Sequence, residues 1–254
     1  TSGDTTGPDV TVAPDVPDVV LEPKGPLALV YKRDPATDAG ELLEVELAAP
    51  VTSADGTLSG DYVQVLNCLN EPGGESLLGF GQFCKESNVA TPGPDGTYLH
   101  ITPPANTNDP EDPFAEVMMF HHVNLIHHYF KNVHGLTSLD YPLQALVNVM
   151  IYIDPTTAGF LGQQPGWIDF PNAAFIPEES FAAFGLPPRP GGAIVFGQYG
   201  YTDFSYDASV IYHEYTHAMV GTTRLTGELV DEWGLDNLPG AMNEGFADYF
   251  AASM

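Results

Sequence analysis

The pentapeptide HEYTH constrains the structure of this chain more than any other segment. It lies in the run DASVIYHEYTHAMVG, which predicts a helix that begins at Asp207 or Ser205 and ends at Gly221. In such a helix His213 and His217 are one turn apart and face the same side. Their ring nitrogens can therefore reach one metal ion at about 2.0–2.1 Å.

Glu214 follows the first of these histidines and lies about 100° around the helix axis from it. At that angle Glu214 cannot share the ligand position, but its carboxylate can lean over a water molecule beside the ion. This is the place of a general base, which removes a proton while the water attacks a carbonyl carbon. Short motifs also arise by chance, so this interpretation needs a second feature.

A second segment, NLPGAMNEGFADYFAASM, supplies that feature, because a catalytic zinc ion takes three protein ligands and leaves its fourth position to water. Asn237 and Pro239 predict the start of a helix in which Glu244 and Asp248 are one turn apart on one face. We expect Glu244 to be the third ligand. Asp248 is expected to accept a hydrogen bond from the outer nitrogen of His213 and so fix its tautomer. The alternative is two solvated carboxylates on an amphipathic helix.

The charge of the chain restricts its partners. It has 34 acidic and seven basic residues, so its formal net charge is −27. Such a surface repels phosphate backbones and anionic headgroups, and we expect no nucleic-acid partner. Carboxylates suit cations, so calcium could be a cofactor in addition to zinc, although no loop has the EF-hand spacing and simple solubility explains the charge equally well.

The amino-terminal half predicts a linker followed by strands. Residues 1–26 are rich in Pro, Asp, Thr and Val and predict an extended, self-repelling linker. Residues 27–105 are expected to be β-rich, because LALVYKR, ELLEVEL, DYVQVLNCL and TYLHI are separated by clusters of turn residues. Cys68 and Cys84 could close a short loop as a disulfide, or they could be two unrelated thiols.

Residues 106–254 predict a region that carries the metal-binding helices. A helix is expected over 113–134, with Asp112 as its cap and Gly135 at its end. LVNVMIYI and AIVFGQY predict buried strands, and the stretch 154–192 between them predicts a long irregular loop. Together these elements give an α+β fold.

Five histidines of the helix over 113–134 do not have the spacing of a metal site. No two of them are three or four residues apart, and pairs seven apart are separated by about 10.5 Å along a helix. We therefore expect core-edge or surface positions for His121, His122, His127, His128 and His134.

The start of the chain is typical of an exported protein. No apolar stretch reaches 18 residues, so no membrane-spanning helix is expected. No charged segment followed by an apolar run begins the chain, and the first residues look like those that follow a removed leader. We therefore expect an extracytoplasmic, secreted or cell-surface protein.

HEYTH followed by NEGFADYF resembles the gluzincin zinc peptidases. The segments KNVHGLTSLD and NAAF resemble the thermolysin-like branch, whereas TRLTG and DPFAEVMMFHHVNLIHHYF resemble the fungalysin-like branch more closely. The resemblance covers roughly residues 110–254. It implies a zincin-like fold with a β-rich amino-terminal part, a zinc-carrying helix in the floor of a cleft, and substrate extended along an edge strand. Asn172 and Ala173 then match the segment that contacts the substrate backbone, although an ordinary turn before a strand explains them as well.

The resemblance also implies parts that these residues do not supply. The family continues with a helical lobe that forms the other wall of the cleft and carries an oxyanion-stabilising histidine. In the thermolysin-like branch, a tyrosine on the segment after the zinc-carrying helix stabilises the transition state. The corresponding segment here, GTTRLTGELVDEW, contains no tyrosine. We expect the carboxy-terminal remainder of the same protein to be a partner of this chain, as a separate polypeptide. Without that remainder we expect poor turnover.

These features predict a secreted zinc-dependent endopeptidase that acts on protein or peptide substrates. The alternative is a non-catalytic exported adhesion or matrix module with a structural or relic zinc site. A third reading is an acidic calcium-buffering surface protein without zinc.

Overall fold

The computed structural model describes residues 24–48, 58–76, 81–105, 109, 111–200, 202–223, 230–231, 234–235 and 238–254. The linker predicted for residues 1–26 lies outside these ranges except for its last three residues, which belong to the first strand. Asn237, the predicted start of the last helix, also lies outside them.

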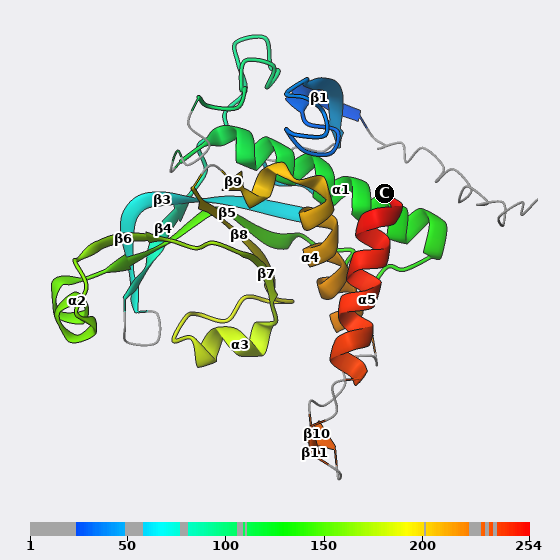
Figure 1. Cartoon of the computed structure of the whole chain (residues 1–254). Coiled ribbons are helices and arrows are strands. Elements are labelled where there is room, and N and C mark those ends of the chain that lie inside the picture. Colours follow the sequence, from blue (N-terminus) through cyan, green and yellow to red (C-terminus); the bar gives the residue numbers. More distant parts are fainter. Residues whose placement is uncertain are drawn as a thin grey trace, which may run out of the picture.

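A mixed sheet forms the frame of the structure (Figure 1). Its main path runs β3-β4-β5-β8-β7, where these strands span Val63–Ser76, Gln82–Ser87, Leu143–Ile153, Ala193–Tyr199 and Ala173–Ile176. Both β3 and β8 run parallel to β5, and β7 is antiparallel to β8. Two further strands, β6 (Gly166–Asp169) and β9 (Thr202–Asp203), pair with β5 and β8. Strand β7 therefore ends this path, at an edge of the sheet.

The helices lie on both sides of this sheet (Figure 1). The longest, α1 (Pro113–His134), lies on one side, and a hairpin of β1 (Lys24–Val30) and β2 (Leu43–Ala48) covers its far side. The other side of the sheet carries α3 (Glu178–Ala183), while α2 (Pro155–Leu161) follows β5. Helix α4 (Ala208–Gly221) packs against α1 and against α5 (Leu238–Ser253). A short 3-10 helix, Phe204–Tyr206, precedes α4, and β10 (Val230–Asp231) pairs with β11 (Gly234–Leu235).

The two faces of β5 and β8 explain why these strands are apolar without alternation. Ala145 and Val147 of β5 join the core under α1, whereas Leu146 and Val149 join a second core under α3. Strands covered on both faces carry apolar side chains in both directions. The sequence prediction of buried strands is therefore confirmed, although β5 begins at Leu143, three residues earlier than expected. The fold is α+β, as predicted.

The ends of α1 follow from its capping residues. Asp112 accepts hydrogen bonds from the backbone N–H groups of Phe114 and Ala115, at 2.9 and 3.1 Å. Pro113 occupies the first turn, where a missing N–H costs nothing. Gly135 ends the helix in the left-handed region, with φ 67°. The predicted bounds are confirmed.

A buried polar network joins α1 to the sheet. Asn67 of β3 donates to Glu116 Oε1 of α1 at 2.7 Å, and Asn148 of β5 donates to Asn67 Oδ1 at 3.0 Å. Gln198 of β8 then donates to Asn148 Oδ1 at 2.7 Å and to Asp203 Oδ2 at 2.9 Å. Burial raises the pKa of Glu116 and of Asp203 to about 7. These bonds orient α1 on the sheet, because each polar group needs its partner once it is buried.

Two predictions about local structure are wrong. TYLHI forms turns instead of a strand, because Asp95 accepts from Thr97 N and the N–H of Tyr98 donates to Leu27 O at 2.7 Å. Tyr98 and Ile101 are buried as anchors of a loop and not as a strand face. The stretch 154–192 is not irregular, since it contains α2, β6, β7 and α3. Each of these has only four to seven residues, too few for a recognisable period.

Cys68 of β3 and Cys84 of β4 form the expected disulfide. Both are buried in the core under α3. The bond ties together the two strands farthest from β7 along the sheet path.

We expect the double substitution Cys68→Ser/Cys84→Ser to lower the free energy of unfolding by about 3 kcal/mol, because the disulfide closes a loop of this size. Urea denaturation followed by circular dichroism measures the change. The wild-type protein in reductant is the matched control and should lose a similar amount. An unchanged midpoint with an unchanged slope would contradict the prediction.

The histidines of α1 lie in the core and not at the surface, with the exception of His134. Burial lowers the pKa of His121 well below its usual range, and the neighbouring His122 adds to this. His121 is therefore neutral in the folded chain and takes up a proton only on unfolding below pH 6.5. Its contribution to stability is complete above that pH and falls as the pH falls.

We therefore expect His121→Phe to make stability less dependent on pH. Between pH 7 and pH 5 the wild-type free energy of unfolding should fall by about 2 kcal/mol more than that of the variant. Urea titrations at pH 7, 6 and 5 measure both proteins. Parallel pH profiles would show that the imidazole is not held neutral in the fold.

Candidate metal centre

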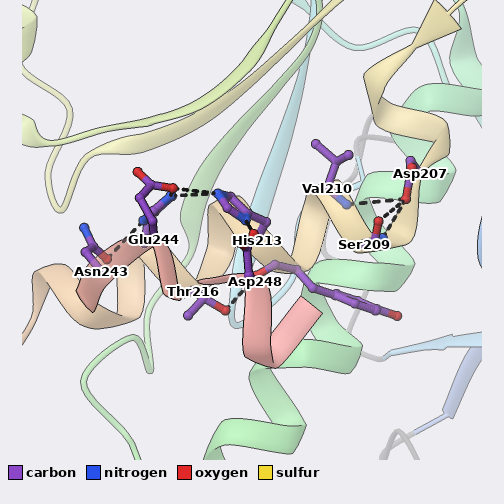
Figure 2. A network of polar contacts seen from close by, with 10 residues as sticks. Asp207, Ser209, Val210, His213, Thr216, Asn243, Glu244 and Asp248 are labelled. Atoms are coloured by element: carbon purple, nitrogen blue, oxygen red, sulfur yellow. Dashed lines mark hydrogen bonds and ion pairs between the residues drawn. The ribbon is translucent and has the colours of Figure 1, made fainter. Parts of the chain in front are cut away.

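Helix α4 begins at a firm capping site (Figure 2). Asp207 Oδ1 accepts from Ser209 N at 2.8 Å and from Val210 N at 3.4 Å, while Ala208 N donates to Arg33 O at 2.7 Å. Asp207 is therefore the cap, and Ser205 lies in the preceding 3-10 helix. The helix ends at Gly221, as the sequence predicted, with Thr222 in the capping position.

Helix α5 lies beside α4 (Figure 1) and brings Glu244 to His213 (Figure 2). The Nε2 atoms of His213 and His217 are 2.9 Å apart. Glu244 Oε2 lies 3.4 Å from the first and 3.5 Å from the second. Among the described residues, these three form a group whose ligand atoms all lie within 4.8 Å of one another.

These distances fit one tetrahedral ion. Ligand atoms about 2.0–2.1 Å from a tetrahedral zinc are separated from each other by about 3.3–3.4 Å. The three observed separations, 2.9, 3.4 and 3.5 Å, lie around that value. The donor set of two imidazole nitrogens and one carboxylate oxygen is also the kind that zinc takes in hydrolytic enzymes. His213, His217 and Glu244 could therefore hold such an ion.

The outer nitrogen of each histidine has an oxygen partner on α5. His213 Nδ1 lies 3.1 Å from Asp248 Oδ1, and His217 Nδ1 lies 3.0 Å from Asn243 Oδ1. With a proton on Nδ1, each ring donates outward and leaves the Nε2 lone pair facing the centre of the group. The contact of Asp248 with His213 is the one expected from the sequence.

The sequence interpretation did not include Asn243. An amide next to the third ligand has no spacing of its own that marks it, and its contact with His217 depends on how α5 crosses α4. The dipeptide Asn243–Glu244 was the available signal, because adjacent residues of one helix can both reach a neighbouring helix near the same turn.

Glu214 lies outside the three-residue group but faces the same space. It is 7% exposed, and its Oε2 accepts a hydrogen bond from Phe175 N of β7 at 2.8 Å. Burial is the main cause that raises the pKa of this carboxyl, against the opposing effects of His217, His213 and the Phe175 N–H. A carboxylate with a raised pKa accepts a proton more readily near neutral pH.

A cleft runs along β7 and extends to both sides of the group formed by His213, His217 and Glu244. One cavity of about 690 Å³ is lined by the three-residue group, by Glu214 and by Ala173, Ala174 and Phe175. A second cavity of about 600 Å³ is lined by Asn172, Ala173, Val210 and Asp248, among others. Ala173 and Glu214 line both cavities, so the cleft passes the reactive groups along the edge strand.

The backbone of β7 presents alternate residues to this cleft. Asn172 O accepts from Gly197 N and so faces β8, whereas Phe175 N faces Glu214. In an antiparallel pair the residues that face the partner alternate, so Ala173 and Phe175 direct their backbone groups away from β8. Asn172 itself is exposed. Both residues predicted to contact substrate therefore lie in the cleft wall.

The amino-acid sequence can also be compared with those of known protein families. Residues 104–254 match the family described as fungalysin metallopeptidase (M36). This chain belongs to the fungalysin metallopeptidase family. The resemblance inferred from HEYTH and NEGFADYF is thereby confirmed, and the family is one of metallopeptidases. A comparison with curated proteins gives no match.

The candidate centre makes a prediction about metal affinity. We expect Asn243→Ala to weaken binding of zinc by about 10–100-fold, because the partner that orients His217 is lost. Glu244→Ala, which removes a ligand, should weaken it more. Competition with a chromophoric chelator measures the affinity. Met242→Ala changes an exposed side chain of the same helix and is the control; equal losses in Met242→Ala and Asn243→Ala would contradict the assignment.

Proposed function

We propose that this chain carries the catalytic centre of a secreted zinc-dependent endopeptidase that hydrolyses internal peptide bonds of proteins and peptides. The observation that carries the proposal is the convergence of His213, His217 and Glu244 on one point, beside Glu214, in a cleft along an edge strand. Membership of a metallopeptidase family supports it. In this proposal residues 106–254 are the catalytic region.

Glu214 is the proton carrier in the proposed reaction. A zinc ion held by the three ligands would lower the pKa of a water molecule and polarise the substrate carbonyl. Glu214 Oε2 is fixed by Phe175 N, so Oε1 is the oxygen that we expect to take the proton from water. The same carboxyl then delivers that proton to the nitrogen of the leaving amine. Asp248 and Asn243 hold the two imidazoles in one tautomer throughout.

The edge strand β7 offers a backbone template for the substrate. An extended peptide that adds to a sheet edge gains main-chain hydrogen bonds regardless of its side chains. Ala173 directs its N–H and C=O to the cleft, and the side chain of Asn172 lies at the same edge. We propose that these two residues bind the substrate backbone next to the bond that is cut.

A catalytic ion is favoured over a structural one by the number of ligands. A structural zinc site is closed by four protein ligands. The group formed by the described residues has three, and the side chain of Glu244 is 65% exposed, so solvent reaches the centre from that side. This separates the proposal from the alternative of an adhesion or matrix module with a structural zinc.

Three exposed apolar side chains on α5 support a partner for this chain. Met242, Phe246 and Tyr249 are 39%, 37% and 64% exposed and follow one another at helical spacing. Such a stripe is commonly covered by another element. We propose that the carboxy-terminal remainder of the same protein covers it and completes the cleft.

The disulfide between Cys68 and Cys84 is compatible with export. The disulfide is typical of oxidising compartments. Among the described residues, no helix has the length and apolarity that a membrane span requires. A calcium requirement stays a prediction, and elemental analysis of the purified protein tests it together with zinc.

We expect Glu214→Gln to lower casein cleavage by at least about 10²–10⁴-fold, because the amide cannot carry the proton. Its zinc content should equal that of the wild type, since Glu214 is outside the ligand group. Cleavage assays with and without chelator, together with metal analysis, measure both. Retained proteolysis in this variant would show that Glu214 is not the base.

The charge of the cleft predicts a substrate preference. Glu178, Glu179 and Glu244 line the larger cavity, and none of the described residues that line it is Lys or Arg. We expect peptides with a Lys near the cleaved bond to be cut with a kcat/KM about tenfold higher than matched Glu peptides at low salt. The ratio of the two kcat/KM values should fall as the salt concentration rises. It should also fall in Glu179→Gln. It should not fall in the control Glu41→Gln, because Glu41 is exposed and outside the cleft. A ratio near one at low salt would contradict it.

A further inference from the structure

Two histidines of α1 bond the two tyrosines that flank the His213–Glu214 pair. His122 Nδ1 lies 2.8 Å from the hydroxyl of Tyr212, and His127 Nδ1 lies 2.8 Å from the hydroxyl of Tyr215. All four side chains are buried. The histidine-rich helix, which the spacing analysis left without a role, is thus bonded directly to the residues around HEYTH.

The direction of both bonds follows from the other ring nitrogen. His122 Nε2 donates to Tyr31 O at 3.0 Å, so its Nδ1 accepts from Tyr212. His127 Nε2 is 3.1 Å from Asp140 Oδ1, a contact without good hydrogen-bond geometry, but it favours the same tautomer.

Burial keeps both rings in this role. It lowers the pKa of His122 and of His127 to about 4, so both rings stay neutral acceptors at Nδ1. Each ring can therefore keep its bond to the tyrosine hydroxyl at neutral pH.

The two tyrosines lie on the side of α4 opposite the histidine ligands. At about 100° per residue, Tyr212 and Tyr215 are centred some 150° around the axis from His213 and His217. The tyrosines meet α1, and the ligands meet α5. Because the tyrosines are three residues apart, their backbone positions are separated by about 4.5 Å along α4. Two such points fix both the rotation of α4 and its position along its axis.

A third point holds the start of the same helix. Ala208 N donates to Arg33 O, and Tyr31, two residues earlier in the chain, holds the ring of His122 through its carbonyl. Both Tyr31 and Arg33 lie within three positions of the end of β1, which is outside the segment that matches the family. The amino-terminal hairpin thus contacts α4 directly at its first turn and indirectly through α1.

We propose that His122 and His127 are positioning residues of the metal centre, which act through Tyr212 and Tyr215 to hold α4 at the rotation that aims His213 and His217 at Glu244. This inference rests on the proposed function. Side-chain tips lie about 5–6 Å from a helix axis, so a 10° rotation moves a ligand by about 1 Å. A displacement of that size can lower a rate by about 10².

The test removes the two hydroxyls in Tyr212→Phe/Tyr215→Phe and loads the full chain with cobalt(II). The visible absorption of cobalt reports the geometry of its ligands, a readout that a general loss of stability does not move. Casein cleavage by the zinc-loaded proteins gives kcat and KM, at a temperature well below each unfolding midpoint. His121→Phe is the control, because it replaces a buried imidazole of the same helix whose Nδ1 has no hydrogen-bond partner.

We expect the double variant to show an altered cobalt spectrum and a kcat that is about 10–100-fold lower with KM within about twofold. The control should match the wild type in both. A variant that unfolds at lower temperature but keeps the wild-type spectrum and kcat overturns the positioning role while leaving the proposed function intact. A wild-type chain that binds cobalt but cleaves nothing overturns the proposed function, and the spectra of the variants still decide the positioning role. A wild-type chain that binds no cobalt overturns both.

Discussion

The contact between α4 and α5 is the interaction on which the candidate centre depends. It brings Glu244 within 3.4 and 3.5 Å of two imidazole nitrogens that one helix already holds 2.9 Å apart. The same crossing gives each outer nitrogen its oxygen partner on α5. Two imidazole nitrogens and a carboxylate oxygen gathered around one point are the donor set of a divalent cation, so we interpret their convergence as a candidate metal site.

The rest of the fold holds α4 in place for this contact. On one side α1 supplies two buried histidines, and its own orientation is fixed by the polar network of Asn67, Asn148 and Glu116. On the other side β7 supplies the Phe175 N–H that fixes Glu214. The candidate ligands and the expected base are therefore supported from different layers, so a change in α1 could move the candidate ligands without touching the cleft.

The sequence predicted the elements whose signals are local. Asp112, Pro113 and Gly135 mark the ends of α1, and Asp207 marks the start of α4, because caps act within one turn. The short elements between residues 154 and 192 gave no such signal, since four to seven residues are too few to show a period. TYLHI looked like a strand because two of its apolar residues, Tyr98 and Ile101, are buried. They are buried in a loop, however, and the segment forms no strand.

The sequence by itself determined that His213 and His217 are one turn apart and that Glu214 lies about 100° around the helix axis from His213. Helical geometry alone fixes the relative positions of such close neighbours. It also determined the family, through HEYTH and NEGFADYF. Only the tertiary structure decided that Glu244 reaches those histidines, that Asn243 holds His217, and that the histidines of α1 bond Tyr212 and Tyr215. These contacts join residues 26 to 90 positions apart, and such contacts depend on how whole helices pack, which no local pattern encodes.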